Sequence, residues 1–214
     1  QLMQFDPKNP LTTDQNEHAE NIIEGGNHLL ELVNEILDLA RVEADQIELS
    51  LSDVNAKDVV AACVKLTTTL GEPRGIRTID QFSNGPSILL LTDQARLKQV
   101  LINLLSNATK FNKNGGTITM EGKEVISGFL RISVTDTGRG IHEDDRSSVF
   151  HLFHRLDVDP MVATEGTGIG LTVSKLLVEQ MAGRIGFESE VGIGSTFWID
   201  LPLASNEDVL IWSD

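Results

Sequence analysis

The hydrophobic positions between residues 12 and 41 recur every three or four residues, the spacing of one face of a helix. Thr12 and Gln15 have the spacing of a capping box, which predicts that this helix begins just after Thr12. The opposite face is mostly acidic. The predicted apolar stripe is Ala19, Ile22, Ile23, Gly26, Leu29, Leu30, Val33, Ile36, Leu37 and Ala40.

A single helix cannot bury such a stripe, so the pattern predicts partner helices. Residues 1–6 resemble the last turns of a preceding helix, and Pro10 marks a short loop. Together these features predict an antiparallel hairpin and a dimeric bundle made from two hairpins. The alternative is a helix that packs only on its own domain.

From residue 49 to 203 the hydrophobic period alternates between that of helices and that of strands. Helices are expected at 55–70, 93–110 and 170–181, and strands at 77–82, 88–91, 117–125, 129–135, 184–190 and 196–201. This order predicts a two-layer α/β sandwich, with helices on one face of a mixed, largely antiparallel sheet. The expected domains are the partial helical hairpin at 1–48, the α/β domain at 49–204 and a tail or linker at 205–214.

Composition narrows the possible functions. The chain has 32 acidic and 17 basic side chains, a net charge of −15, and residues 1–50 alone hold −9 of it. Nucleic-acid binding and docking on anionic membranes are therefore not expected. No apolar run approaches the roughly 20 residues that cross a bilayer. The single cysteine, Cys63, fits a reducing compartment, so we expect a cytoplasmic location whatever anchors the parent protein.

Two polar motifs suggest a nucleotide site. Asn103, Asn107 and Lys110 share one helix face, where amide oxygens can complete a Mg²⁺ shell and a lysine can meet phosphates. Asp136 follows a strand and precedes Gly138 and Gly140, so it can accept a hydrogen bond from an exocyclic amine beside a flat ring. Taken singly, the first motif could be an ordinary solvated face and the second an ordinary Asp–Gly turn.

Two glycine-rich stretches follow. Gly166, Gly168 and Gly170 open a helix, where backbone N–H groups and the helix dipole favour phosphate oxygens. This stretch matches neither a Walker A loop nor a dinucleotide fingerprint. The polar run 155–165 before it is typical of a mobile lid. The second stretch is 192–197, where Thr196 could reach a base through a water.

In this order the motifs resemble the catalytic, ATP-binding domain of sensor histidine kinases, in the gyrase–chaperone–kinase (GHKL) superfamily. The resemblance covers residues 51–203 and implies a Bergerat-type ATP-binding fold. The stretch 103–112 is similar to the asparagine box, 149–156 to the phenylalanine box, and 136–141, 166–171 and 192–197 to the three glycine boxes. The helix through 28–41 is similar to the second helix of the family's dimerisation hairpin.

The resemblance implies ATP and Mg²⁺ as cofactors and a role for each matching residue. Asp136 would hold the adenine amine with help from Thr196, and Phe111 and Ile141 would line the base pocket. The implied metal positions are Asn103 and Asn107, and the catalytic candidates are Asn103, Lys110 and Arg155. The remaining nucleotide contacts are Gly138, Gly140, Gly166, Thr167, Gly168, Gly170 and Leu171. The implied partners are a second copy of the chain and the receiver domain of a response regulator.

The sequence departs from the family at the phosphate acceptor. The family's acceptor histidine and its following motif are missing, and His18 and His28 lack that context. We expect the acceptor helix to precede Gln1 in a longer parent; the alternative is a protein that lost it. Two other functions stay open: an ATP hydrolase of the same superfamily, and a nucleotide-sensing dimer module without catalysis.

Overall fold

The computed structural model of the chain describes residues 11–43, 48–126, 128–152 and 168–204. The chain divides into two compact units, Gln1–Asp45 and Gln46–Asp214, and each is described by itself. Among the described helices none is long and apolar enough to cross a membrane.

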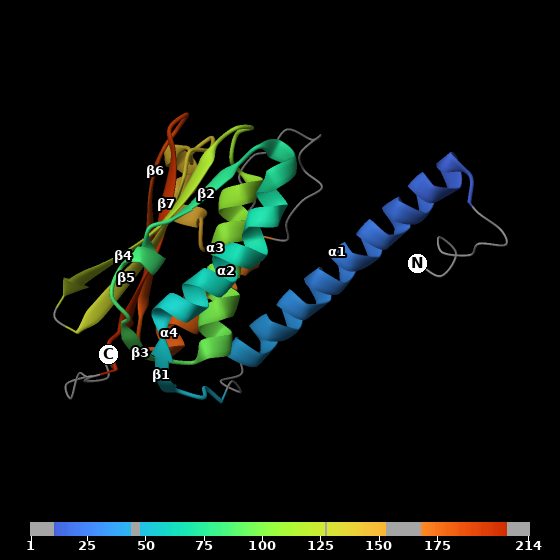
Figure 1. Cartoon of the computed structure of the whole chain (residues 1–214). Coiled ribbons are helices and arrows are strands. Elements are labelled where there is room, and N and C mark those ends of the chain that lie inside the picture. The colour runs from blue at the N-terminus through green and yellow to red at the C-terminus, as the bar shows by residue number, and fades with distance from the viewer. Residues whose placement is uncertain (1–10, 44–47, 127, 153–167, 205–214) are drawn as a thin grey trace. The chain divides into compact units, whose positions relative to one another are not determined.

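The described part of the first unit is helix α1, Thr13–Glu43 (Figure 1). Its start confirms the expected capping box, because the Thr12 N–H donates to Gln15 Oε1 at 3.0 Å and the Gln15 N–H to Thr12 Oγ1 at 3.3 Å. Six large apolar side chains of the predicted stripe are exposed: Ile22, Leu29, Leu30, Val33, Ile36 and Leu37. The predicted preceding helix lies outside the described residues, and the hairpin and its dimer stay predictions.

The second unit contains a five-stranded sheet in the order β2-β4-β5-β7-β6. The β2–β4 pair is parallel and the other pairs are antiparallel. The strands are β2 Arg77–Asp80, β4 Thr117–Ile126, β5 Phe129–Asp136, β6 Arg184–Glu190 and β7 Gly194–Pro202.

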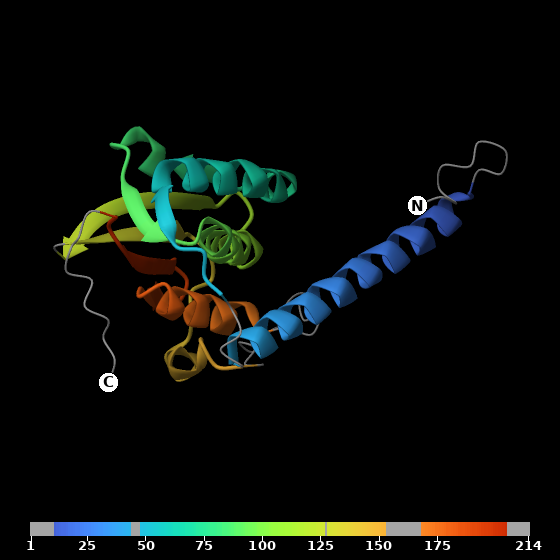
Figure 2. The ribbon, with the colours of Figure 1, turned by 90° about the horizontal axis from the view of Figure 1, so that it is seen from below.

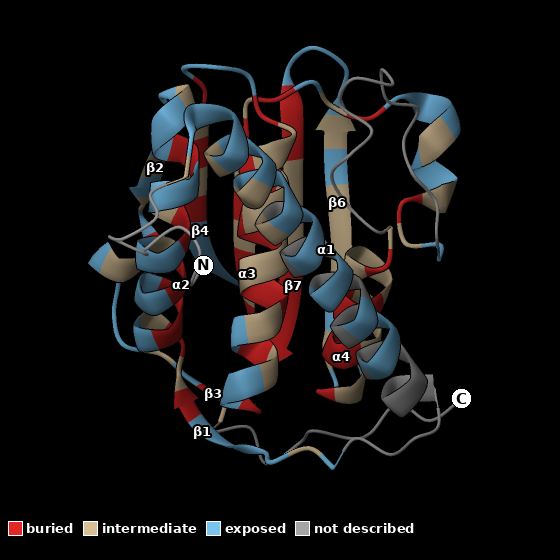
Figure 3. Ribbon diagram, turned by 90° about the vertical axis from the view of Figure 1, so that its right-hand side faces the viewer, coloured by how far each residue is buried: buried red, intermediate tan, exposed pale blue. Residues whose placement is uncertain are grey.

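Three helices cover one face of this sheet: α2 Ala56–Gly71, α3 Gln94–Lys110 and α4 Gly170–Gln180 (Figures 1 and 2). Buried residues lie where the helices meet the sheet, on β4, on β7 and along parts of α2 and α3 (Figure 3). The largest fully buried side chains include Leu97, Leu101, Leu104, Ile118, Met120, Ile132 and Leu177. The predicted α/β sandwich with a mixed sheet is confirmed.

The strands alternate between the two faces of the sheet. On β5, Leu130, Ile132 and Val134 are buried against the helices, and the residues between them are half-buried on the other face. On that second face Arg131 makes a bidentate pair with Asp200, at 2.7 and 2.8 Å, and stacks over the Trp198 ring at 3.7 Å. Hydrogen bonding to Asp200 raises the pKa of Arg131, and burial opposes this rise.

A second, two-stranded sheet pairs β1, Ser52–Asn55, with β3, Leu89–Thr92. The sequence pattern did not predict β1, because only Val54 of its four residues is buried. The predicted strand 77–82 also ends early, because β2 stops at Asp80 and Phe82 begins a short 3-10 turn, Phe82–Asn84. Two more such turns, Glu72–Arg74 and Glu143–Ser148, follow α2 and β5.

Helix α3 has a defined start. Asp93 is its N-cap, and Oδ1 accepts the N–H groups of Ala95 at 2.9 Å and Arg96 at 3.1 Å. The other oxygen, Oδ2, accepts the Ser50 N–H at 2.9 Å. Burial alone would raise the pKa of Asp93, but these three N–H groups and the Arg96 charge lower it below its ordinary value. The helix that carries Asn103 and Asn107 is thus fixed at its first turn.

Candidate nucleotide site

Asp136 is the last residue of β5 and lies on its helix-facing side. The carboxylate is only 7% exposed, and Oδ1 accepts the N–H of Gly138 at 2.7 Å and that of Ser195 at 3.3 Å. Burial raises the pKa of Asp136, and these two N–H groups partly oppose the rise. The second oxygen, Oδ2, has no hydrogen-bond partner among the residues that the structure describes. It can therefore accept a hydrogen bond from a ligand amine.

Two glycines let the backbone approach this carboxylate. Gly138 lies so close to Phe111 that an added Cβ would come within 2.3 Å of the Phe111 carbonyl oxygen. Gly194 has φ +147°, and an added Cβ would come within 2.0 Å of the Asp136 carbonyl oxygen. Both positions exclude larger residues.

Gly140 and Ile141 are held against the β6–β7 turn. Gly140 lies beside the carbonyl of Glu190, the last residue of β6. The Ile141 N–H donates to Ser189 Oγ at 2.8 Å, and the Ile141 side chain is buried. The segment after Asp136 is therefore tied to the β6–β7 hairpin, whose second strand contains Ser195.

Thr196, expected to help hold the base, lies on the side of β7 that faces away from Asp136. Thr196 pairs with Thr135 across β5 and β7, and their hydroxyls lie 3.0 Å apart on the face opposite Asp136. The neighbouring Ser195 lies on the Asp136 side, where its N–H reaches the carboxylate and its hydroxyl lies 2.9 Å from Ser189 Oγ. Neighbouring residues of a strand point to opposite faces of the sheet, so Ser195 and Thr196, one position apart, cannot both face Asp136. That hydroxyl belongs to Ser195.

Asn103 and Asn107 are brought together on α3, next to the start of α4. The Asn107 Nδ2 donates to Asn103 Oδ1 at 3.4 Å, and the Asn103 Nδ2 donates to Ser174 Oγ at 2.8 Å. Gly170 is so close that an added Cβ would lie 2.6 Å from Asn103 Oδ1. The Asn103 amide oxygen thus faces the start of α4, and a helix N-terminus favours anions.

This donor set suits a metal that arrives with phosphates. No group of three or more His, Cys, Asp or Glu in the described part of the chain is arranged to hold a metal ion. Asn103 Oδ1 keeps a second lone pair, and the described residues offer Asn107 Oδ1 no hydrogen bond. Neutral amide oxygens beside a helix N-terminus fit Mg²⁺ bound through phosphate oxygens better than a resident ion.

Lys110 and Phe111 end the same helix. The Lys110 Nζ lies 5.2 Å from the centroid of the Phe111 ring, and the Arg139 guanidinium carbon lies 4.9 Å from it. The Phe111 carbonyl accepts the Arg139 N–H at 3.3 Å. Two cations therefore gather at the end of α3 that leads toward Asp136, inside a chain of strongly negative net charge.

The third glycine stretch is described only in part. Gly168 has φ +72°, Ile169 is fully buried, and α4 begins at Gly170 with Leu171 half-buried. The Thr172 hydroxyl donates to the Phe150 carbonyl at 3.0 Å, which ties the expected phenylalanine box to α4. The predicted site residues Arg155, Gly166 and Thr167 lie outside the described residues.

Sequence reasoning missed Ser174, Ser195 and Arg139. Ser174 follows Gly170 by one helical turn, so its helix face was a usable signal. To identify Ser195, one must know the pairing register between β5 and β7. No local signal distinguishes Arg139 from an ordinary surface arginine.

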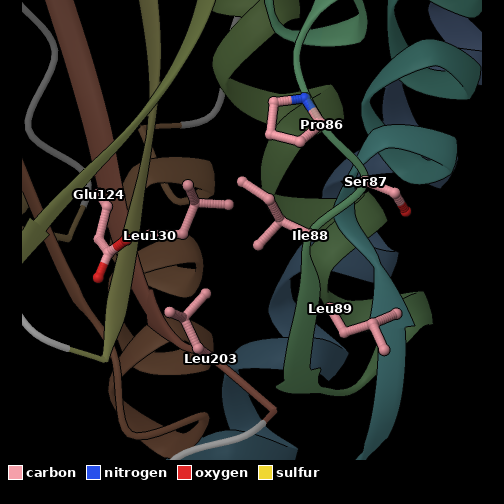
Figure 4. Close-up of a pocket in the computed structure, with 7 residues that line it drawn as sticks. All are labelled: Pro86, Ser87, Ile88, Leu89, Glu124, Leu130 and Leu203. Carbon is pink, nitrogen blue, oxygen red and sulfur yellow. The ribbon is translucent and has the colours of Figure 1, made fainter.

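A separate hollow of about 400 Å³ lies at the other end of the sheet. Its lining comes from residues 86–89, which lead into β3, from β4, from β5 and from Leu203 (Figure 4). Leu130, at the start of β5, lines it, whereas Asp136 ends that strand, six residues or roughly 20 Å away. The hollow is apolar apart from Glu124 and Ser87, so it is not part of the candidate nucleotide site.

Comparison with known proteins agrees with this geometry. Residues 92–205, about half the chain, match the sequence model of the family described as histidine kinase-, DNA gyrase B-, and HSP90-like ATPases. The chain is 34% identical to the sensor histidine kinase GacS of Pseudomonas protegens, over 94% of this chain and 22% of GacS. It is 30% identical to the signal transduction histidine-protein kinase BarA of Escherichia coli K12, over 95% of this chain and 22% of BarA. The chain thus spans about a fifth of these relatives.

Solved structures give the same result. Full-length ShkA in complex with AMPPNP matches with a TM-score of 0.78 and 32% identity, over 96% of this chain and 42% of ShkA. The Acinetobacter baumannii histidine kinase AdeS matches with a TM-score of 0.69 over 91% of this chain and 86% of AdeS; at 23% identity it supports the fold alone.

The chain belongs to the histidine kinase-, DNA gyrase B- and HSP90-like ATPase family, and it contains the catalytic ATP-binding domain of a two-component sensor histidine kinase.

Proposed function

We propose that the chain is a kinase core that binds Mg-ATP and directs its γ-phosphoryl group to a histidine outside this chain. The observation that carries the proposal is the pairing of two features: the buried Asp136 carboxylate, with one oxygen available to a ligand, and the Asn103–Asn107 amide pair beside the start of α4. The first suits the amine of adenine and the second suits a metal-bound triphosphate. The relative ShkA was solved with an ATP analogue, which supports ATP as the ligand.

In this proposal the described residues divide into a base end and a phosphate end. At the base end Asp136 would accept from the adenine amine, Ser195 would assist it, and Phe111 and Ile141 would line the pocket. At the phosphate end Asn103 and Asn107 would hold Mg²⁺ and Lys110 would face the phosphates. Backbone N–H groups of residues 166–171 would complete the phosphate contacts, and Arg155 stays a candidate for the γ-phosphate.

Bound Mg²⁺ would neutralise charge on the phosphates and on the group being transferred. The protein's own part is positioning, because the Asp136 carboxylate fixes the base while the two cations near Phe111 offset the negative net charge. A neutral imidazole would attack through its unprotonated nitrogen, so the attacking atom itself has no proton to lose, whereas an attacking water does. Asn103 has no proton-accepting carboxylate, which favours transfer to a histidine over hydrolysis by water.

We further propose the context of this core. The exposed apolar stripe of α1 would pair with a second copy of the chain within residues 1–48, and the catalytic domain would be residues 49–204. Residues 205–214 would be a tail or linker. The second partner would be a response-regulator receiver domain in the cytoplasm, and the acidic charge disfavours nucleic acid.

One experiment separates this function from the two alternatives. The chain is mixed with γ-labelled ATP, Mg²⁺ and the acceptor hairpin of its parent kinase, and acid-labile phosphohistidine and free phosphate are both measured. Phosphohistidine that disappears in Asp136→Asn supports the kinase. Release of free phosphate without phosphohistidine would indicate an ATP hydrolase, and ATP binding with neither product would indicate a sensing module.

A further inference from the structure

We propose that Arg74, in the turn between α2 and β2, is a positioning residue for the phosphate half of the nucleotide site. It acts through the last turn of α3 and touches no ligand itself. The inference rests on the proposed nucleotide function, and it concerns a residue that precedes the matched family segment, 92–205.

The Arg74 side chain binds the end of α3 at several points. Nη1 donates to the carbonyl oxygens of Thr109 at 2.9 Å and Lys110 at 3.0 Å, and Nη2 donates to the Asn112 carbonyl. Nε donates to Asn114 Oδ1 at 3.1 Å. The last carbonyls of a helix have no partners within the helix, and a positive charge there is favourable. The planar guanidinium can satisfy several such acceptors at once, which a lysine ammonium does with less fixed geometry.

The turn holding Arg74 is itself fixed. Glu72–Arg74 forms a 3-10 turn, and Gly75 closes it with φ +65° and an N–H that donates to the Glu72 carbonyl at 3.0 Å. The Gly115 N–H donates to the Arg74 carbonyl at 2.9 Å, so the turn and the loop after α3 are joined in both directions. Arg74 therefore anchors α3 from a rigid base.

The same stretch of chain is held from the opposite side by the segment after Asp136. The Thr137 hydroxyl donates to Asn112 Oδ1 at 3.2 Å, and Asn112 Nδ2 donates to the Thr117 carbonyl at 3.1 Å. The Arg139 N–H donates to the Phe111 carbonyl at 3.3 Å. Residues 109–112 are thus clamped between Arg74 and the β5 end, which sets where the last turn of α3 lies relative to Asp136.

The loss of Arg74 should affect the phosphate end and the base end of a bound nucleotide differently. The residues proposed to face phosphates and metal, Asn107 and Lys110, lie in the turn that Arg74 holds. The residue proposed to hold the base, Asp136, lies on β5 and takes its hydrogen bonds from Gly138 and Ser195. Phe111, which is proposed to line the base pocket, also lies in the held stretch, but its carbonyl keeps the hydrogen bond from the Arg139 N–H when Arg74 is lost. Loss of the Arg74 contacts should therefore weaken binding of the triphosphate much more than binding of the bare nucleoside.

The test compares Mg-ATP with adenosine on the full chain, by chemical-shift titration, for Arg74→Ala and Arg74→Lys. We expect Arg74→Ala to raise the Kd for Mg-ATP about tenfold, as expected for loss of more than one hydrogen bond, and to change the Kd for adenosine less than about twofold. The Kd of Arg74→Lys for Mg-ATP should lie between those of the unaltered chain and Arg74→Ala. Amide hydrogen exchange at Phe111, whose N–H donates to the Asn107 carbonyl at 3.0 Å, should be faster in both variants.

Arg77→Ala is the matched control. Arg77 is exposed at the start of β2, and its side chain has no hydrogen bond or ion pair within the described part of the chain. The Arg77→Ala substitution therefore removes the same charge as Arg74→Ala and leaves the contacts of α3 intact. It should change neither affinity. A purely structural Arg74 would lower the thermal midpoint with an unchanged ratio of the two affinities, and that result overturns the inference. If Arg74→Ala does not fold, the ratio in Arg74→Lys decides. Failure of the unaltered chain to bind Mg-ATP would instead reject the proposed function.

Discussion

The side-chain amide of Asn103 donates to the Ser174 hydroxyl at 2.8 Å, and this bond joins α3 to α4. It fixes the direction of the amide, because the nitrogen is engaged by α4 and the oxygen accepts from Asn107 Nδ2 at 3.4 Å. An oxygen held this way is available to a metal without reorientation. Ser174 is thus an orienting partner for the proposed Mg²⁺ position.

The first prediction removes this orienting bond. In Ser174→Ala the Asn103 amide can turn, so we expect the Kd for Mg-ATP to rise by about three- to tenfold, as for loss of one hydrogen bond. Calorimetric titration in the presence of Mg²⁺ measures the change. Ser133→Ala is the control, because Ser133 lies on the other face of the sheet and has no side-chain hydrogen bond with any described residue. Equal affinities in Ser174→Ala and the unaltered chain would show that Ser174 does not orient Asn103.

The second prediction concerns hydrolysis. An asparagine at position 103 cannot take a proton from water, so the chain alone should release phosphate from ATP at a negligible rate. A continuous phosphate-release assay with excess Mg-ATP measures it. Robust turnover that Asn103→Ala abolishes would mean that this position supports water attack after all, and would favour the hydrolase.

The fold of the second unit could be predicted in outline because its strands and helices bury one face each. The alternation at Leu130, Ile132 and Val134 identifies β5 from sequence alone, and the structure confirms it. Strand β1 could not be found this way, because it is short and mostly polar, and it is stabilised by pairing with β3. Such pairing joins residues distant in sequence and leaves no local pattern.

The candidate site was predictable in its residue types and less so in its contacts. Asp136 and the two asparagines stand out by motif, but the choice between Ser195 and Thr196 depends on the register between β5 and β7. The Asn103–Ser174 bond spans 71 positions of sequence, and the Arg74 contacts join a turn to the end of a helix that begins 20 positions later. These relationships follow from packing of whole elements, so no spacing rule shows them.

The third prediction tests the N-cap of α3. Asp93→Ala should lower the free energy of unfolding at pH 7 by about 1–2 kcal/mol, because two helix N–H groups and that of Ser50 lose their acceptor. The surroundings of Asp93 lower its pKa in the folded state. Its stabilising contribution to folding is therefore present above the unfolded-state pKa of 3.8 and is lost as the pH falls below that value. Urea unfolding at pH 7 and at about pH 2.5, which lies below the unfolded-state value, measures both effects. Exposed Asp53→Asn should unfold as the unaltered chain does; a similar result for Asp93→Ala would reject the cap.

The fourth prediction uses Cys63 as a probe of the core. Burial raises the pKa of the Cys63 thiol to about 11, with the Lys98 charge opposing the rise. The native thiol should therefore react with a disulfide reagent at pH 8 only as fast as the chain unfolds, and at once in urea. Because the unfolded thiol ionises near pH 9 and the folded one near 11, stability should fall as the pH rises between them. Rapid labelling of the folded chain would contradict the burial of α2.

The fifth prediction separates function from stability at Asp136. Burial raises the pKa of this carboxyl, so its ionised form disfavours folding at neutral pH, and the contribution becomes more unfavourable as the pH rises through the folded-state value. Asp136→Asn removes that charge and keeps an oxygen that can accept from Gly138 and Ser195. Its thermal midpoint at pH 7 should therefore equal or exceed that of the unaltered chain. A large drop would mean that the carboxylate is needed for folding.

The most direct test of the nucleotide site is a titration with Mg-ATP of the unaltered chain, Asp136→Asn, Asn107→Ala and the exposed control Asp53→Asn. The account predicts binding by the unaltered chain and the control, and an affinity at least about tenfold weaker in each site variant, with all four chains folded. The same affinity in all four chains would contradict it, because the carboxylate and the amide would then have no part in holding the nucleotide.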